Sequence, residues 1–193
     1  MAVENISAEE ALQRLVDGNA RAVADGHTHP HNDSERRASL VGGQKPFAII
    51  IACADSRVVP ELAFDQGLGD VFTIAVAGNV ASPEVIGSAE YAVAHLGVNL
   101  VVVMGHQSCG AVGAACAGGD NGPHLNQLVS HIVPAVAKVG EQGLDAVVRE
   151  HASHSARAMI ERSDIIGGAV NEGRCRVVPA YYSLEDGSVS FLD

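Results

Sequence analysis

The sequence predicts an α/β fold in which a central, mostly parallel β-sheet of about four strands, extended by a C-terminal hairpin strand, is flanked by helices. Three short runs rich in Val and Ile, at residues 47–54, 71–77 and 100–104, are typical of buried parallel strands. Helical patterns of apolar residues separate these runs, at residues 60–65 and 83–95. Strand and helix therefore alternate along the chain, and right-handed crossovers between parallel strands are expected.

An amphipathic helical arm is expected at the N-terminus, before the sheet. Apolar residues recur with helical spacing over residues 7–24, and Ser7 followed three residues later by Glu10 is the signature of a capping box. A polar loop that contains several histidines and a short helical turn separates this helix from the first strand. Because the loop is long, we expect the helix to pack on a neighbouring subunit.

The C-terminal part of the chain is expected to be helical up to a closing hairpin. Helices are expected over residues 109–117, 124–139 with a kink at Pro134, 144–162 and 164–172, and hairpin strands over 175–184 and 189–192. We interpret residues 1–193 as a single domain with three parts. These parts are a helical arm and loop (1–43), a core that carries the chemistry (44–113), and the later helices with the hairpin (114–193).

Composition narrows the classes of function. With 23 acidic residues against 12 Lys and Arg, the formal net charge is -11, which would repel a phosphate backbone, so nucleic acid is not an expected partner. The sequence has no apolar run of the roughly 18 residues that a membrane span needs and no signal-peptide pattern, so we expect no membrane partner and a cytoplasmic location. Its four cysteines are too few for a disulfide scaffold and are interpreted as buried thiols, metal ligands or catalytic groups.

Three candidate metal ligands follow strands of the predicted sheet. Cys53 closes the first apolar run, and His106 and Cys109 follow the third. Because the carboxyl ends of strands in an open parallel sheet border one crevice, these side chains are expected to converge. Zn(II) binds thiolate and imidazole tetrahedrally, and two cysteines with one histidine leave a fourth position open for water or substrate. The alternative is that both cysteines are ordinary buried thiols.

Asp55 and Arg57 follow Cys53 at a spacing of two, which places them on the same side of an extended segment. A carboxylate beside a metal can ligate it or accept a hydrogen bond from metal-bound hydroxide. A bidentate grip by Arg57 on Asp55 would favour the second role. The alternative is a salt bridge that only braces the end of the strand.

Two motifs together resemble the signature of the β-class carbonic anhydrases. They are CADSR at residues 53–57 and GHQSCGAV at residues 105–112. The similarity extends over residues 7–193 and is strongest over 44–113. The resemblance implies one Zn(II) per chain. It also implies a homodimer or homotetramer with sites at the dimer interface.

The resemblance also implies a role for each candidate residue. Cys53, His106 and Cys109 would be the zinc ligands. Asp55 would be a catalytic carboxylate or a conditional fourth ligand, with Arg57 as its partner. The implied reaction is the reversible hydration of CO2 to bicarbonate and a proton, by attack of a zinc-bound hydroxide that Asp55 and Arg57 orient.

Three further residues are candidates for binding CO2 or bicarbonate. Gln44 matches the glutamine that hydrogen-bonds bicarbonate in similar proteins, and Tyr91 matches an aromatic residue that lines the pocket. Gly110 is expected to border the small apolar space that admits CO2. One departure is Ala75, which stands where similar proteins have an arginine that in some of them binds an inhibitory bicarbonate. We therefore expect no such regulatory site.

Two alternative functions use the same residues. A zinc hydrolase could act on another small heterocumulene, such as carbon disulfide. A non-catalytic zinc module would have Asp55 closing the fourth position permanently.

Overall fold

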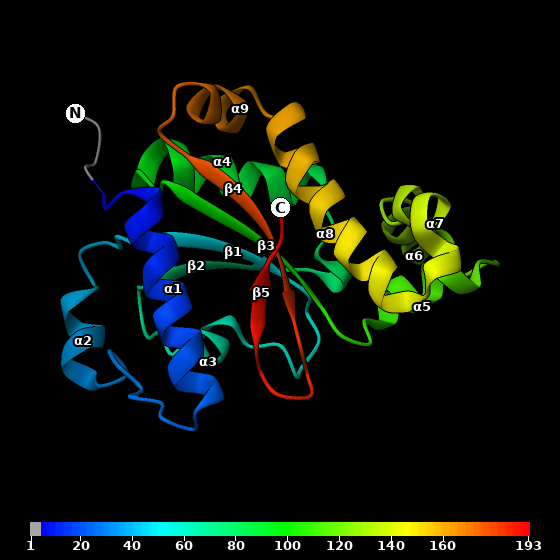
Figure 1. Cartoon of the computed structure of the whole chain (residues 1–193). Helices are drawn as coiled ribbons and strands as arrows, with labels where there is room; N and C mark the ends of the chain where they lie inside the picture. The colour runs from blue at the N-terminus through cyan, green and yellow to red at the C-terminus, as the bar shows by residue number, and fades with distance from the viewer. Residues whose placement is uncertain (1–4) are drawn as a thin grey trace.

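The β-sheet of the computed structural model, which describes residues 5–193, has five strands in the order β2-β1-β3-β4-β5 (Figure 1). Strands β1 to β4 are parallel, and β5 runs antiparallel to β4. The strands are β1 (Ala48–Ala52), β2 (Val71–Ala75), β3 (Leu100–His106), β4 (Arg176–Tyr182) and β5 (Val189–Phe191). The predicted fold class is confirmed, including the closing hairpin strand.

Helices cover both faces of the sheet. They are α1 (Ala8–Val23), α2 (Ser34–Ser39), α3 (Pro60–Ala63), α4 (Pro83–Leu96), α5 (Gly110–Ala117), α6 (Pro123–Ser130), α7 (Val133–Val139), α8 (Leu144–Glu161) and α9 (Asp164–Asn171), with the 3-10 turns η1 (Ala77–Asn79) and η2 (Gly140–Gln142). Helices α1 and α3 lie on one face, and α4, α8 and α9 lie on the other (Figure 1). Within residues 5–193, no helix is long and apolar enough to cross a membrane.

Strand β1 is buried along its whole length because both faces of the sheet are covered. Ile49 and Ile51 point into the cluster beneath α4, α8 and α9, whereas Ile50 points into the cluster beneath α1 and α3. A third apolar cluster, which includes Val112 and Ile132, lies beyond the carboxyl ends of the strands, between α5, α7 and α8. This third cluster surrounds the candidate metal ligands.

The N-terminal helix packs on its own sheet, and contact of its outer face with a neighbouring subunit stays a prediction. The apolar face of α1 lies on its own sheet, where Ala11 and Leu15 are fully buried. The long loop brings the helix back over the sheet instead of carrying it away. Ser7 caps the helix by accepting a hydrogen bond from the amide of Glu10, as the capping box predicts, but the Glu10 carboxylate pairs with Arg14.

The helix expected over residues 124–139 is two helices, α6 and α7, and not one helix with a kink. The break falls at residues 131–132, where the amides of His131 and Ile132 bond to carbonyls three residues back. Ile132 is fully buried at this step. Pro134 lies in the first turn of α7, where its missing N–H costs no hydrogen bond. The proline therefore begins a helix and does not bend one.

Two buried aspartates tie the histidine-containing loop to the body of the protein. The Asp65 side chain is fully buried, pairs with Arg21 of α1 and accepts hydrogen bonds from the amide and hydroxyl of Thr28. Burial pushes the pKa of Asp65 upward, but these hydrogen bonds outweigh it and hold the pKa below its usual range. Asp70 makes a similar pair with His31. The loop is thus anchored by two buried carboxylates.

Gly18 allows α1 to approach α3, and we predict that Gly18→Ala destabilises the protein. A β-carbon at Gly18 would overlap the backbone carbonyl of Phe64. Because backbone cannot rotate aside, we expect a loss of about 1–3 kcal/mol in the free energy of unfolding. Gly87→Ala is the matched control, since a β-carbon there meets nothing within 4 Å on α4, and it should stabilise by up to about 1 kcal/mol. Urea unfolding measures both, and equal effects would contradict the prediction.

Candidate metal centre

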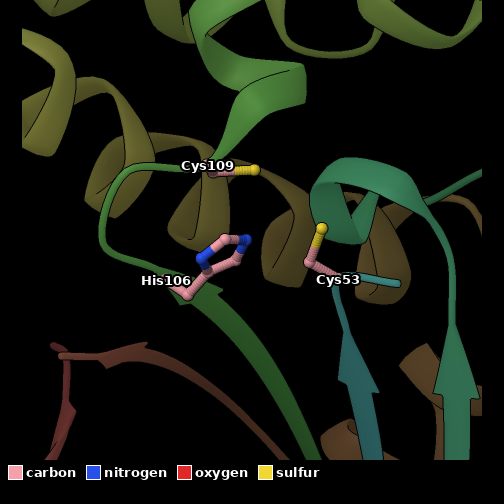
Figure 2. A group of neighbouring side chains, drawn as sticks. All are labelled: Cys53, His106 and Cys109. Carbon is pink, nitrogen blue, oxygen red and sulfur yellow. The ribbon is translucent and has the colours of Figure 1, made fainter. Parts of the chain in front are cut away.

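Cys53, His106 and Cys109 come together at the carboxyl ends of two neighbouring strands. Strands β1 and β3 pair in parallel register, with Ala52 opposite Met104. Cys53 directly follows β1, His106 is the last residue of β3, and Cys109 caps the N-terminus of α5. Their ligand atoms all lie within 4.8 Å of one another and all three residues are buried. Figure 2 shows both sulfurs and the imidazole facing a common space.

The turn between His106 and Cys109 depends on two residues that sequence reasoning did not select. Ser108 has a φ of 57°, in the left-handed region, which reverses the chain between the two ligands. The side-chain oxygen of Gln107 accepts hydrogen bonds from the amides of Leu184 and Glu185. The turn is therefore fixed to the β4–β5 connection. Neither residue gave a signal in the sequence beyond its place inside the motif.

The imidazole of His106 is held with one nitrogen free for a metal. Nδ1 donates a hydrogen bond to the carbonyl oxygen of Gln107, 2.9 Å away, which leaves Nε2 with its lone pair. Nε2 is buried and has no hydrogen-bond partner within residues 5–193. A buried acceptor without a partner is costly, and a zinc ion between two sulfurs would satisfy it. The donor set therefore fits Zn(II).

The two thiols of the site favour a single negative charge between them in the absence of a metal. A hydrogen bond from the Cys109 thiol lowers the pKa of Cys53 despite its burial. The same bond to Cys53, and burial, raise the pKa of Cys109. The amide of Gly78 also donates to the Cys53 sulfur, at 3.3 Å. Cys53 is thus ready to ligate as a thiolate.

Asp55 and Arg57 form a bidentate ion pair beside the three ligands. Arg57 Nε lies 2.9 Å from Oδ1 and Nη2 lies 2.7 Å from Oδ2 of Asp55. The Arg57 side chain, followed by the Arg57 amide, holds the pKa of Asp55 below its usual range. Oδ2 of Asp55 lies 3.9 Å from Nε2 of His106. The pair was expected on an extended segment, but it forms within the turn that follows β1.

Comparison with known proteins agrees with this geometry. Residues 48–189 match the profile of the family described as carbonic anhydrase. Carbonic anhydrase 2 of Mycobacterium tuberculosis is 39% identical over 98% of this chain and 95% of its own length. The carbonic anhydrase of Mycolicibacterium smegmatis is 40% identical over 93% of this chain and 90% of its own. The chain belongs to the carbonic anhydrase family.

Solved structures identify the class within that family. One of the tetrameric β-carbonic anhydrases of the filamentous ascomycete Sordaria macrospora aligns with a TM-score of 0.75 and 25% identity over 95% of both chains. A β-carbonic anhydrase of Aspergillus fumigatus aligns with a TM-score of 0.72 and 26% identity over 96% of this chain and 90% of its own. The resemblance to the β-carbonic anhydrases that the two motifs predicted is confirmed.

The three residues predicted to bind CO2 or bicarbonate lie on different elements of the fold. Gly110 is the first residue of α5, directly after Cys109. Gln44 is exposed in the loop before β1, and Tyr91 is half exposed on α4, where its ring lies beside Phe72 and His95. Within residues 5–193, no hydrogen bond joins Gln44 or Tyr91 to the Cys–His–Cys group. Their roles in substrate binding stay predictions.

Proposed function

We propose that the chain catalyses the reversible hydration of CO2 to bicarbonate and a proton, with one Zn(II) per chain held by Cys53, His106 and Cys109. The observation that carries this proposal is the convergence of two sulfurs and an unpaired, buried imidazole nitrogen within 4.8 Å in a member of the carbonic anhydrase family. Three ligands of this kind leave a fourth position for water or substrate.

The metal would supply the nucleophile, because zinc lowers the pKa of a coordinated water from roughly 16 to about 7, an effect for which carbonic anhydrases are themselves the standard example. Asp55 would accept a hydrogen bond from that nucleophile and so orient it. Its distance of 3.9 Å from Nε2 of His106 supports this role. Arg57 would keep the carboxylate ionised and turned toward itself, since it binds both oxygens.

The same ion pair argues against a site that Asp55 closes permanently. A carboxylate whose two oxygens are both bonded to a guanidinium is turned toward that partner, so Arg57 competes with a metal for Asp55. The fourth position is therefore better suited to catalysis than to structural zinc binding. Asp55 would ligate only when Arg57 releases it.

We further propose that the chain works as a homodimer or homotetramer in the cytoplasm, with residues 1–193 forming one domain. The tetrameric relatives of Sordaria macrospora support self-association. Strand β2 also supports it, because this edge strand is only partly covered although it carries apolar residues. A neighbouring subunit would bring Gln44 and Tyr91, which are exposed here, to the substrate. All four cysteines are free, in keeping with a reducing compartment.

We predict that the purified protein carries about one zinc per chain and hydrates CO2. Metal content by mass spectrometry and stopped-flow CO2 hydration between roughly pH 6.5 and 9 test this, because the nucleophile forms as pH rises through the pKa of the zinc-bound water. Removal of zinc with a chelator should abolish activity, and added zinc should restore it. Zinc-loaded protein without hydration activity across this range would overturn the proposal.

A further inference from the structure

His151 is a buried histidine on α8 that belongs to none of the groups described above. Its side chain is fully buried, and Nε2 lies 2.8 Å from the carbonyl oxygen of Gly78. Because the partner is a carbonyl, Nε2 carries the proton and donates. Nδ1 has no hydrogen-bond partner in the part of the chain that the structure describes. Burying an imidazole nitrogen without a hydrogen-bond partner costs free energy, and an apolar side chain at this position would avoid that cost. The hydrogen bond to Gly78 is the interaction that an apolar side chain could not make.

Gly78 is the residue whose amide donates to the sulfur of Cys53. It lies in the turn η1 between β2 and α4, with φ 70° and ψ 16°, and Asn79 after it is also left-handed, with a φ of 44°. A β-carbon at Gly78 would press on Ile132 and Ala111 at about 3 Å. The direction of the amide therefore depends on an unusual backbone conformation that the sheet hydrogen bonds do not fix.

The two polar groups of Gly78 connect α8 with the metal centre. Its carbonyl accepts from His151 and its amide donates to Cys53, at 2.8 Å and 3.3 Å. We propose that His151 is a positioning residue that holds the η1 turn so that the amide of Gly78 points at the sulfur of Cys53. This inference rests on the proposed function, because it assumes that Cys53 is a zinc ligand.

The hydrogen bond to the sulfur has a chemical consequence for the site. An N–H bond to the sulfur stabilises the negative charge of the thiolate and fixes its direction, and loss of an outer partner of this kind typically lowers metal affinity by about 10–100-fold. His151 does not add charge of its own at neutral pH, since burial lowers its pKa to about 4. Its effect on the sulfur passes through the geometry of the Gly78 backbone.

Three variants of the full-length protein test the proposal. His151→Phe removes the donor and keeps a ring in the core. His151→Gln keeps an N–H donor at nearly the position of Nε2. Met159→Ala is the control, because Met159 is fully buried on the same helix but lies in the cluster beneath α4 and α9, away from η1. Should the phenylalanine variant not fold, His151→Asn, whose amide is too short to reach Gly78, takes its place.

Two measurements are made on each variant. Competition with a chelator gives the zinc affinity, which we expect to fall about 10-fold in His151→Phe and to stay within about 3-fold of wild type in His151→Gln. Substitution with Co(II) gives the sulfur-to-metal charge-transfer band, which should move to longer wavelength in His151→Phe alone. A thiolate that loses its N–H donor holds its electrons less tightly.

The outcomes separate this inference from the proposed function. Wild-type zinc affinity and an unchanged cobalt band in His151→Phe would overturn it. It is equally wrong if Met159→Ala reproduces the change, or if His151→Gln fails to restore it. If the wild-type protein binds no zinc, both the proposed function and this inference fail.

Discussion

Cys109→Ala is expected to abolish both zinc binding and CO2 hydration. Cys109 is the N-cap residue of α5 with its sulfur facing Cys53 and His106, and its side chain is buried, so its removal takes away one of the three converging ligand atoms. Changing a partner outside the metal ligands typically costs 10–100-fold in affinity, and loss of a ligand itself should cost more than about 100-fold. Chelator competition and metal content measure the affinity, and stopped-flow hydration measures the activity.

Cys116→Ala is the matched control for this prediction. Cys116 is an exposed cysteine near the other end of the same helix, and it is not one of the three converging residues. This variant should keep full zinc content and activity. A Cys109→Ala protein that retains zinc with near wild-type affinity would show that the metal is not held by the Cys–His–Cys group, and the proposed function would lose its site.

The parts of this protein that the sequence predicts well are those where chemistry and local pattern coincide. Cys53 directly follows one buried strand rich in Val and Ile, and His106 is the last residue of another. Parallel strands place their carboxyl ends at one edge of a sheet. Convergence of the ligands therefore follows from strand order and spacing alone. The pairing of Asp55 with Arg57 is equally local, since only one residue separates them.

The parts that the sequence does not predict depend on contacts between distant segments. The position of α1 follows from burial of Leu15 against the sheet and from anchors such as Asp65, which no pattern within residues 7–24 reveals. Similarly, the hydrogen bond between His151 and Gly78 joins residues that are 73 positions apart in the sequence. It also depends on the left-handed φ values of the η1 turn, which cannot be read from the sequence. A lone histidine in a helical pattern is indistinguishable from an ordinary polar residue until the fold is known.

Asp55→Ala is expected to retain zinc and to lose CO2 hydration by about 100-fold or more, the usual size of a positioned proton acceptor's contribution. Asp55 is not one of the three converging ligands, and both of its oxygens are bonded to Arg57, so its removal leaves the metal donors in place. Without the carboxylate, nothing orients the nucleophile or accepts its hydrogen bond. Zinc content and stopped-flow hydration, measured on the same preparation, check the two halves of this prediction. The control is Asp120→Ala, which removes an exposed carboxylate on the loop between α5 and α6 and should leave both unchanged.

Arg57→Gln then distinguishes the two roles open to Asp55. Loss of the guanidinium frees the carboxylate, whose pKa rises toward its ordinary value because Arg57 is the first cause of its depression. If Asp55 is kept off the metal by Arg57, the freed carboxylate should occupy the fourth position, so that zinc binds more tightly while hydration falls. The double variant with Asp55→Ala should lose this gain in affinity, because the extra ligand is gone. Unchanged zinc affinity in Arg57→Gln would mean that Asp55 does not compete for the metal, and that the arginine acts only by orienting the carboxylate.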